Sequence, residues 1–221
     1  MNRRFLNLVL PAVILAPICL SAERSMIPLP APKKTGGTSV ETALATRRSV
    51  RAYTKESLTL ADIAQLLWAA QGVTAPDGKR TAPSAMHRYP LEIAVVAQHV
   101  EGLPNGAYRY VPATHSLQLL VSTQPETQLL AKAATQAQVQ AAPAVFVIAA
   151  VYERMGAGPR NRTWTDYEAG LASENLLLEA TALGLGAVVT GGMDPGLVKE
   201  VVKFTGSEEV IVVIPVGHPA R

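Results

Sequence analysis

The sequence lacks the residues and motifs of several common kinds of catalysis. It has one cysteine, Cys19, and its four histidines (His87, His99, His115 and His218) do not have the spacing of metal ligands, so we expect no metal. There is no Gly-x-Ser-x-Gly elbow, no phosphate loop ending in Gly-Lys-Ser/Thr and no His-Glu-x-x-His motif. Aromatic residues are only 5% of the chain and form no run beside basic residues, so we expect no nucleic-acid partner. What remains is chemistry that a cofactor would carry.

Residues 1–22 have the pattern of a signal peptide. Arg3 and Arg4 precede an apolar stretch at 6–20, and Ala22 is a small residue at the expected cut site. The alternatives are a retained membrane anchor and a lipoprotein attached at Cys19. The stretch is short for a membrane span and is broken by two prolines, which favours cleavage.

Cleavage would change the charge and the cysteine content of the chain. The formal net charge of +3 falls to near +1, because 18 basic and 17 acidic residues remain without Arg3 and Arg4. The basic pI therefore comes partly from the export signal. The mature chain would have no disulfide, thiol nucleophile or cysteine ligand. We expect an exported protein, periplasmic or secreted, without a stable membrane span.

The remaining chain suits one compact domain. Its composition, 48% hydrophobic and 17% charged, is that of a globular protein. Residues 23–37 are rich in proline and glycine, which predicts a linker that holds no helix or central strand. We assign residues 38–221 to the domain.

Hydrophobic periodicity and capping residues predict a mixture of helices and strands. Thr59 and Asp62 form a capping box for a helix that stops at Gly72, and we interpret Thr165 and Glu168 as a second one. The second box begins a core helix that runs to Leu183, with Gly184 as its stop. Further helices are predicted at 38–46, 124–140 and 195–204, and strands at 91–97, 107–111, 116–121, 144–151, 187–190 and 210–216. The tyrosines of the hairpin, Tyr108 and Tyr110, are expected to be half-exposed.

These elements do not alternate strictly, and one pair of strands is a hairpin. The order therefore favours an α+β fold over a doubly wound parallel sheet.

A basic segment at 47–51 is the first candidate binding site. Arg47, Ser49 and Arg51 would point to one side of an extended chain, where guanidinium groups bind phosphate and carbonyl oxygens. Taken alone, a solvated basic run is the more common explanation.

The wider pattern of motifs resembles the FMN-dependent nitroreductase family over about residues 39–221. The branch with the closest resemblance includes azoline (thiazoline/oxazoline) dehydrogenases. The motifs that carry the resemblance are Arg-Arg-Ser-Val-Arg-x-Tyr at 47–53 and the segments 66–74, 80–85, 89–92, 168–178, 182–187, 191–194 and 214–219. The resemblance implies a nitroreductase-like fold with a central mixed, mostly antiparallel sheet flanked by helices. It also implies a homodimer with FMN at the interface.

By position, the resemblance implies that the basic segment holds the cofactor. Arg47, Arg48, Ser49 and Arg51 would hold the phosphate, the ribityl chain and the pyrimidine edge. Arg221 would complete the phosphate site or, as the terminal residue, would be frayed.

Two further segments complete the implied site. Gly191 and Gly192 would bring backbone N–H groups close to flavin N5 and O4, where donors stabilise negative charge on the reduced ring. The partner chain would line the isoalloxazine with Pro83, Ser84, Ala85 and Met86.

The resemblance implies an oxidoreductase that passes electrons by hydride transfer through FMN N5 to a nitroaromatic or quinone, in ping-pong order. Two alternatives stay open: an FMN-dependent dehydrogenase that oxidises a small molecule or peptide, and a non-catalytic flavin-binding protein.

The chain departs from its relatives at Met86-His87-Arg88, where Gly-Ala-Leu is common, and it lacks the Lys-Tyr pair of azoline dehydrogenases. NAD(P)H is a candidate electron donor, although export would separate the enzyme from the cytoplasmic pool.

The export signal can be tested directly. The segment at 2–6 partly resembles a twin-arginine signal, which would let FMN load before export. Replacing both Arg3 and Arg4 with lysine should leave precursor inside the cell, as measured by fractionation and immunoblotting. Unchanged export would indicate the general secretory route.

Overall fold

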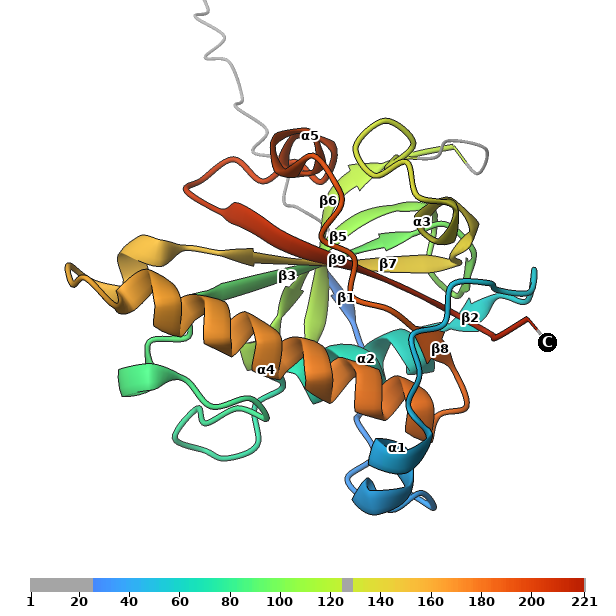
Figure 1. Cartoon of the computed structure of the whole chain (residues 1–221), viewed down its shortest axis with the longest axis horizontal. Helices are drawn as coiled ribbons and strands as arrows, with labels where there is room; N and C mark the ends of the chain where they lie inside the picture. Colours follow the sequence, from blue (N-terminus) through green and yellow to red (C-terminus); the bar gives the residue numbers. More distant parts are fainter. Residues whose placement is uncertain (1–25, 125–128, 221) are drawn as a thin grey trace, which may run out of the picture.

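The structure, a computed structural model, describes residues 26–124 and 129–220 (Figure 1). The predicted signal peptide and Arg221 lie outside the described residues, so both assignments stay predictions. Over the described ranges, no helix combines the length and the apolar character that crossing a membrane requires.

The centre of the domain is a seven-stranded sheet in which every pairing is antiparallel. A separate pair of two-residue strands, β2 (Leu58–Thr59) and β4 (Val100–Glu101), is parallel. The predicted mostly antiparallel character of the central sheet is therefore confirmed, and the parallel pairing lies in the separate pair. In spatial order the seven strands are β1 (Met26–Pro28), β6 (Ser116–Ser122), β5 (Gly106–Val111), β3 (Leu91–Ala97), β7 (Ala144–Ala150), β9 (Glu209–Gly217) and β8 (Gly186–Ala187).

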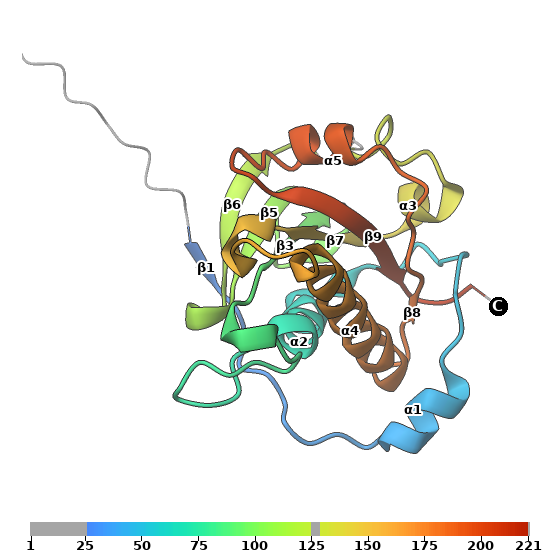
Figure 2. The same cartoon turned by 60° about the vertical axis from the view of Figure 1, so that its left-hand side comes forward.

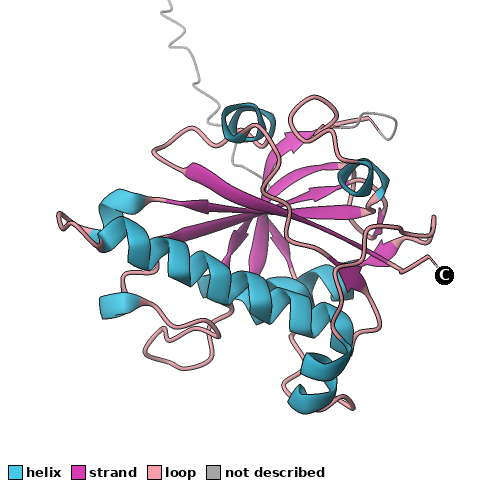
Figure 3. Cartoon of the chain, in the orientation of Figure 1, coloured by secondary structure: helices cyan, strands magenta, loops and turns pink. Residues whose placement is uncertain are grey.

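Helices cover both faces of this sheet. One face carries α2 (Leu60–Gln71) and the long α4 (Asn161–Ala182), and the other carries α3 (Ala137–Ala141) and α5 (Pro195–Val201) (Figures 2 and 3). The short helix α1 (Val40–Thr46) lies beside the C-terminal end of α4. The central strands β3 and β7 are buried on both sides in this arrangement, which explains their long apolar runs.

The central strand β7 divides its side chains between two hydrophobic cores. Phe146 and Ile148 belong to the core under α2 and α4, whereas Val145 and Val147 belong to the core under α3 and α5. This alternation follows from the two-residue period of a strand. Packing in both cores therefore fixes the position of β7. The candidate site lies at the edge of the same seven-stranded sheet.

Several predicted elements are confirmed. The strand β3 has the predicted bounds, and Thr59 accepts from the Asp62 backbone while Asp62 accepts from that of Thr59, as in a capping box. Gly184 ends α4 with a φ of +74°, a conformation that favours glycine.

The predicted start of α4 is wrong. The helix begins at Asn161, and Thr165 lies inside it, fully buried, with its hydroxyl donating to the Asn161 carbonyl over 3.0 Å. Glu168 does not cap the helix either; it accepts from the backbone N–H of Ala85. Thr165 thus bonds one turn back within the helix, and Glu168 bonds to a distant loop.

Three other expectations are corrected. A helix was predicted at 124–140, of which residues 125–128 lie outside the described residues. Among the other residues of this segment, only those of α3 at its end form an α-helix. Tertiary contacts of the buried residues override the helix propensity of the alanines. Tyr108 and Tyr110 are buried, with 1% and 3% of their surfaces exposed. Leu171 belongs to the helix that was predicted to lie in the core, but it is 46% exposed.

Part of the predicted linker belongs to the sheet. Met26 to Pro28 form the edge strand β1, which pairs with β6. An edge strand tolerates proline because one side of it needs no ladder hydrogen bonds. Lys33 then pairs its backbone with the Gln65 side chain, so this arm is attached to the domain.

A network of charged side chains lies next to the core under α3 and α5. Arg109 donates to Glu92 over 2.7 Å and to Glu208 over 2.6 Å, and it lies over the ring of Phe204. Arg154 also pairs with Glu92. Burial alone would raise the pKa of Glu208, but the hydrogen bond and charge of Arg109 outweigh it and lower the net pKa.

Arg109→Met should destabilise the fold strongly. It leaves Glu208, only 7% exposed in its side chain, without its guanidinium, and removing one partner of a buried pair costs roughly 3–5 kcal/mol. Urea unfolding at one fixed protein concentration would measure this loss. Lys79→Met, which breaks an exposed pair with Asp77, is the control and should change little. Equal effects of the two variants would contradict the prediction.

Candidate functional site

The basic segment runs in an extended conformation along the edge of the sheet. Helix α1 ends at Arg47, whose φ and ψ of −55° and 127° leave the helical region. The N–H of Val50 then donates to the Ala187 carbonyl over 3.1 Å, which ties the segment to β8. A Cβ at Gly186 would lie 2.5 Å from Val50, so glycine is required there for close approach of the two chains.

The side chains of this segment differ in their surroundings. Arg47 is partly buried, and its Nε lies 3.5 Å from a carboxylate oxygen of Glu174 on α4. Arg48 is exposed and donates to the carbonyls of Ala45 and Arg47 at the end of α1. Ser49 and Arg51 are exposed. Arg47 is thus the member of the cluster that reaches α4.

Gly191 and Gly192 follow the same edge of the sheet. Thr190 exchanges both backbone hydrogen bonds with Val213 of β9, after which the two exposed glycines leave the edge. A Cβ at Gly191 would meet nothing within 4 Å, whereas one at Gly192 would lie 2.8 Å from the Gln136 amide nitrogen. The Thr190 hydroxyl and the side-chain amide oxygen of Gln136 are buried without a hydrogen-bond partner among the described residues.

A cavity of about 230 Å³ lies near these two segments, although none of their residues lines it. Its walls come from α4, including Gly170 and Glu174, and from the sheet edge at Val189 and Val212. Glu174 contacts Arg47, and Val189 lies two residues before Gly191. The basic segment thus contacts one wall residue of this cavity, and the glycine pair follows another in sequence. Its volume is below the ~300–1,000 Å³ of typical cofactor pockets.

The segment at 83–86 lies at a different face of α4. The carboxylate of Glu168 accepts from the Ala85 N–H over 2.7 Å and from the Ser84 hydroxyl over 3.1 Å. Pro83, Ala85 and Met86 line a cavity of about 350 Å³ together with the aromatic face of α4. Glu168 and Glu174 are about 120° apart around the helix and about 9 Å apart along it. One chain thus does not bring the two halves of the predicted site together.

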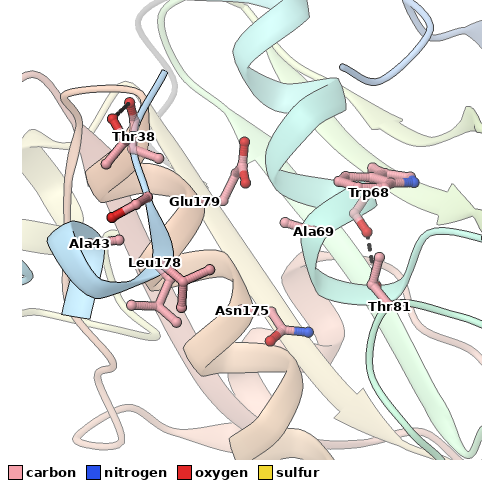
Figure 4. A pocket seen from close by; sticks show the side chains of 11 residues that line it. Thr38, Ala43, Trp68, Ala69, Thr81, Asn175, Leu178 and Glu179 are labelled. Carbon is pink, nitrogen blue, oxygen red and sulfur yellow. Dashed lines mark hydrogen bonds between the residues drawn. The ribbon is translucent and has the colours of Figure 1, made fainter. Parts of the chain in front are cut away.

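A third cavity, of about 250 Å³, lies between α1, α2 and α4 (Figure 4). Trp68 and Ala69 of α2 face Leu178 and Glu179 of α4 across it. Trp68 thus forms part of the wall on the α2 side. None of the predicted cofactor-binding residues lines this cavity, so it is separate from the candidate site.

Glu168 is the residue that the sequence reasoning assigned wrongly. It is 4% exposed, and burial raises its pKa, although the Ala85 and Ser84 hydrogen bonds oppose the shift. Within the described ranges, no group of three or more histidine, aspartate or glutamate side chains is arranged to hold a metal ion.

Comparison with known proteins gives consistent matches. Residues 44–218 match the model of the Nitroreductase family. A nitroreductase homologue of Methanocaldococcus jannaschii is 38% identical over 181 residues, which cover 81% of this chain and 90% of that protein.

Solved structures match as well. A nitroreductase homologue from Ralstonia eutropha is 29% identical, covers 97% of both chains and has a TM-score of 0.74. One from Desulfovibrio desulfuricans, solved in complex with FMN, is 22% identical over 83% of this chain and 88% of that one, with a TM-score of 0.60. The fold also matches the Escherichia coli microcin synthetase McbBCD complex with truncated pro-MccB17 bound, at 18% identity, a TM-score of 0.67 and coverage of 97% and 85%.

Proposed function

This chain belongs to the nitroreductase family, a family of flavin-dependent oxidoreductases, and we propose that it binds FMN and passes electrons to a small organic acceptor. The observation that carries the proposal is the contact of Arg47 with Glu174 of α4, beside a cavity whose wall at Val189 lies two residues before Gly191.

The residues around this cavity fit an FMN molecule. Arg47, with Ser49 and Arg51, supplies donors for the phosphate and the pyrimidine edge. Open space over Gly191 permits close approach to its backbone, and the unpartnered Thr190 hydroxyl is a further polar group beside it. Arg48 has other partners in the conformation described, and Arg221 lies outside the described residues, so their contacts to FMN stay predictions.

We propose that two chains complete the site. The face of α4 beside the 83–86 segment is apolar, and it leaves Tyr167 62% and Leu171 46% exposed. Exposed side chains of this kind mark an interaction surface. A symmetric dimer buries the same face on both chains. It also explains why the cavity beside Arg47 is small and why Pro83, Ser84, Ala85 and Met86 lie away from it.

The protein's part in the reaction is binding and orientation. Bound FMN supplies hydride transfer through its N5 atom. Arg47 and its neighbours hold the cofactor, and the backbone N–H groups of Gly191 and Gly192 stabilise negative charge that develops beside them. Met86 limits the size of the molecule that reaches the ring. The proposed acceptor is a nitroaromatic or a quinone.

The electron donor and the location of the protein are also proposals. NAD(P)H is consistent with membership of the family. The signal-like segment at 1–22 supports export, which would require a different donor or a source of nicotinamide cofactor outside the cytoplasm.

The wild-type protein should be a yellow dimer that releases FMN on denaturation, and Arg47→Ala should be a dimer that retains FMN poorly. Losing a charged hydrogen-bond partner costs roughly 2–5 kcal/mol, which is about thirtyfold or more in affinity. Fluorescence titration with FMN and sedimentation would measure both properties. The control is Lys203→Ala, an exposed cation after α5. A colourless monomer, or an Arg47→Ala protein with wild-type affinity, would reject the proposed site.

The reaction should follow ping-pong kinetics. Donor and acceptor both need the exposed face of the cofactor, and one small pocket does not hold the two together. Double-reciprocal plots at several fixed acceptor concentrations should therefore be parallel. Intersecting lines would mean that both substrates bind at once.

A further inference from the structure

Glu168 has an environment that a helix-surface carboxylate does not need. It is 4% exposed, and its Oε1 atom accepts both the Ala85 N–H over 2.7 Å and the Ser84 hydroxyl over 3.1 Å. The Ser84 oxygen in turn accepts the N–H of Tyr89 over 2.8 Å. One carboxyl group thus holds the start of the 84–89 loop directly and, through Ser84, its end.

The second carboxyl oxygen of Glu168, Oε2, is buried and has no partner among the described residues. Burial raises the pKa of Glu168, although the Ala85 and Ser84 hydrogen bonds oppose the shift. In either protonation state the carboxyl group offers Oε1 as an acceptor for both donors. Glutamine has the same shape and the same acceptor.

The loop that Glu168 holds is strained. Met86, His87 and Tyr89 have φ values of 55°, 55° and 44°, in the left-handed region that side chains other than glycine disfavour. Such conformations persist only where surrounding contacts over-determine them. The Glu168 hydrogen bonds are contacts of this kind.

The strained residue Met86 forms a wall of the 350 Å³ apolar cavity, so the loop conformation affects the width of that cavity. Trp164, Tyr167 and Leu171 form the opposite wall on α4, and Met86 is 60% exposed. A relaxed loop would move Met86 and widen the cavity.

We propose, building on the proposed function, that Glu168 is a positioning residue that makes the enzyme selective for small planar acceptors. Its carboxyl clamps Ser84 and Ala85, so that Met86 stays in the strained conformation and narrows the cavity. Bulky acceptors are excluded by the position of Met86 and not by Glu168 itself.

The test compares acceptors of two sizes with FMN-loaded enzyme that has been reduced with dithionite, so that no nicotinamide donor is needed. Stopped-flow reoxidation by 1,4-benzoquinone and by 9,10-phenanthrenequinone gives a bulky-to-small rate ratio for each variant. The variants are Glu168→Ala, Glu168→Gln and Ser84→Ala. Met86→Gly gives the ratio for an open cavity, and Glu200→Ala, an exposed carboxylate on α5, is the matched control.

Glu168→Ala should raise the ratio about tenfold, the factor that corresponds to roughly 1.4 kcal/mol. Glu168→Gln should stay within about twofold of wild type, because its amide oxygen accepts the same two hydrogen bonds. Ser84→Ala should raise the ratio less than Glu168→Ala. Trypsin should cleave after Arg88 faster in Glu168→Ala than in Glu168→Gln.

An unchanged ratio in Glu168→Ala, or a Glu168→Gln enzyme that behaves like it, would overturn the proposal. If Glu168→Ala does not fold, Ser84→Ala decides, and its unchanged ratio would overturn the proposal equally. Failure of the proposed function gives a different result: reduced wild-type enzyme that neither quinone reoxidises, or wild-type protein that does not bind FMN.

Discussion

The packing of α4 on the sheet is the constraint on which the candidate site depends. Ala169, Ala172, Leu176 and Ala180 recur every three or four residues and are all buried against the core. Three of the four are alanines, so the helix can lie close to the strands. This contact fixes the rotation of α4, and with it the directions of the carboxylates on its other faces. A helix rotated by one residue would turn those carboxylates by about 100°.

Two of these carboxylates organise the two halves of the site. Glu174 contacts Arg47 of the basic segment, and Glu168 holds Ser84 and Ala85. Because they point to different faces of one rigid helix, a single chain keeps the cofactor-binding segment and the acceptor-side loop apart. The proposed dimer resolves this separation, since the loop of one chain meets the cofactor of the other. The apolar face of α4 has the exposed Leu171 that such an interface would bury.

Much of the fold could be predicted from local patterns. The apolar run of β3 and the Thr59–Asp62 capping box specify their elements through neighbours a few residues away. The predictions that were wrong concern residues whose partners lie far away in the sequence. The pattern of Thr165 and Glu168 matched a capping box, but Glu168 bonds to a backbone group 83 residues earlier in the chain. No local pattern contains that partner.

The sequence by itself determined the element types, the α+β class, the membership of a family and the segments that form the candidate site. These depend on periodicity, capping and ordered motifs, which short stretches of chain encode. Only the tertiary structure decided that Arg47 contacts Glu174 of α4 beside a cavity, that Leu171 is exposed and that Glu168 holds a strained loop. Each of these facts depends on which segments the sheet and α4 bring together, and long-range packing sets that arrangement.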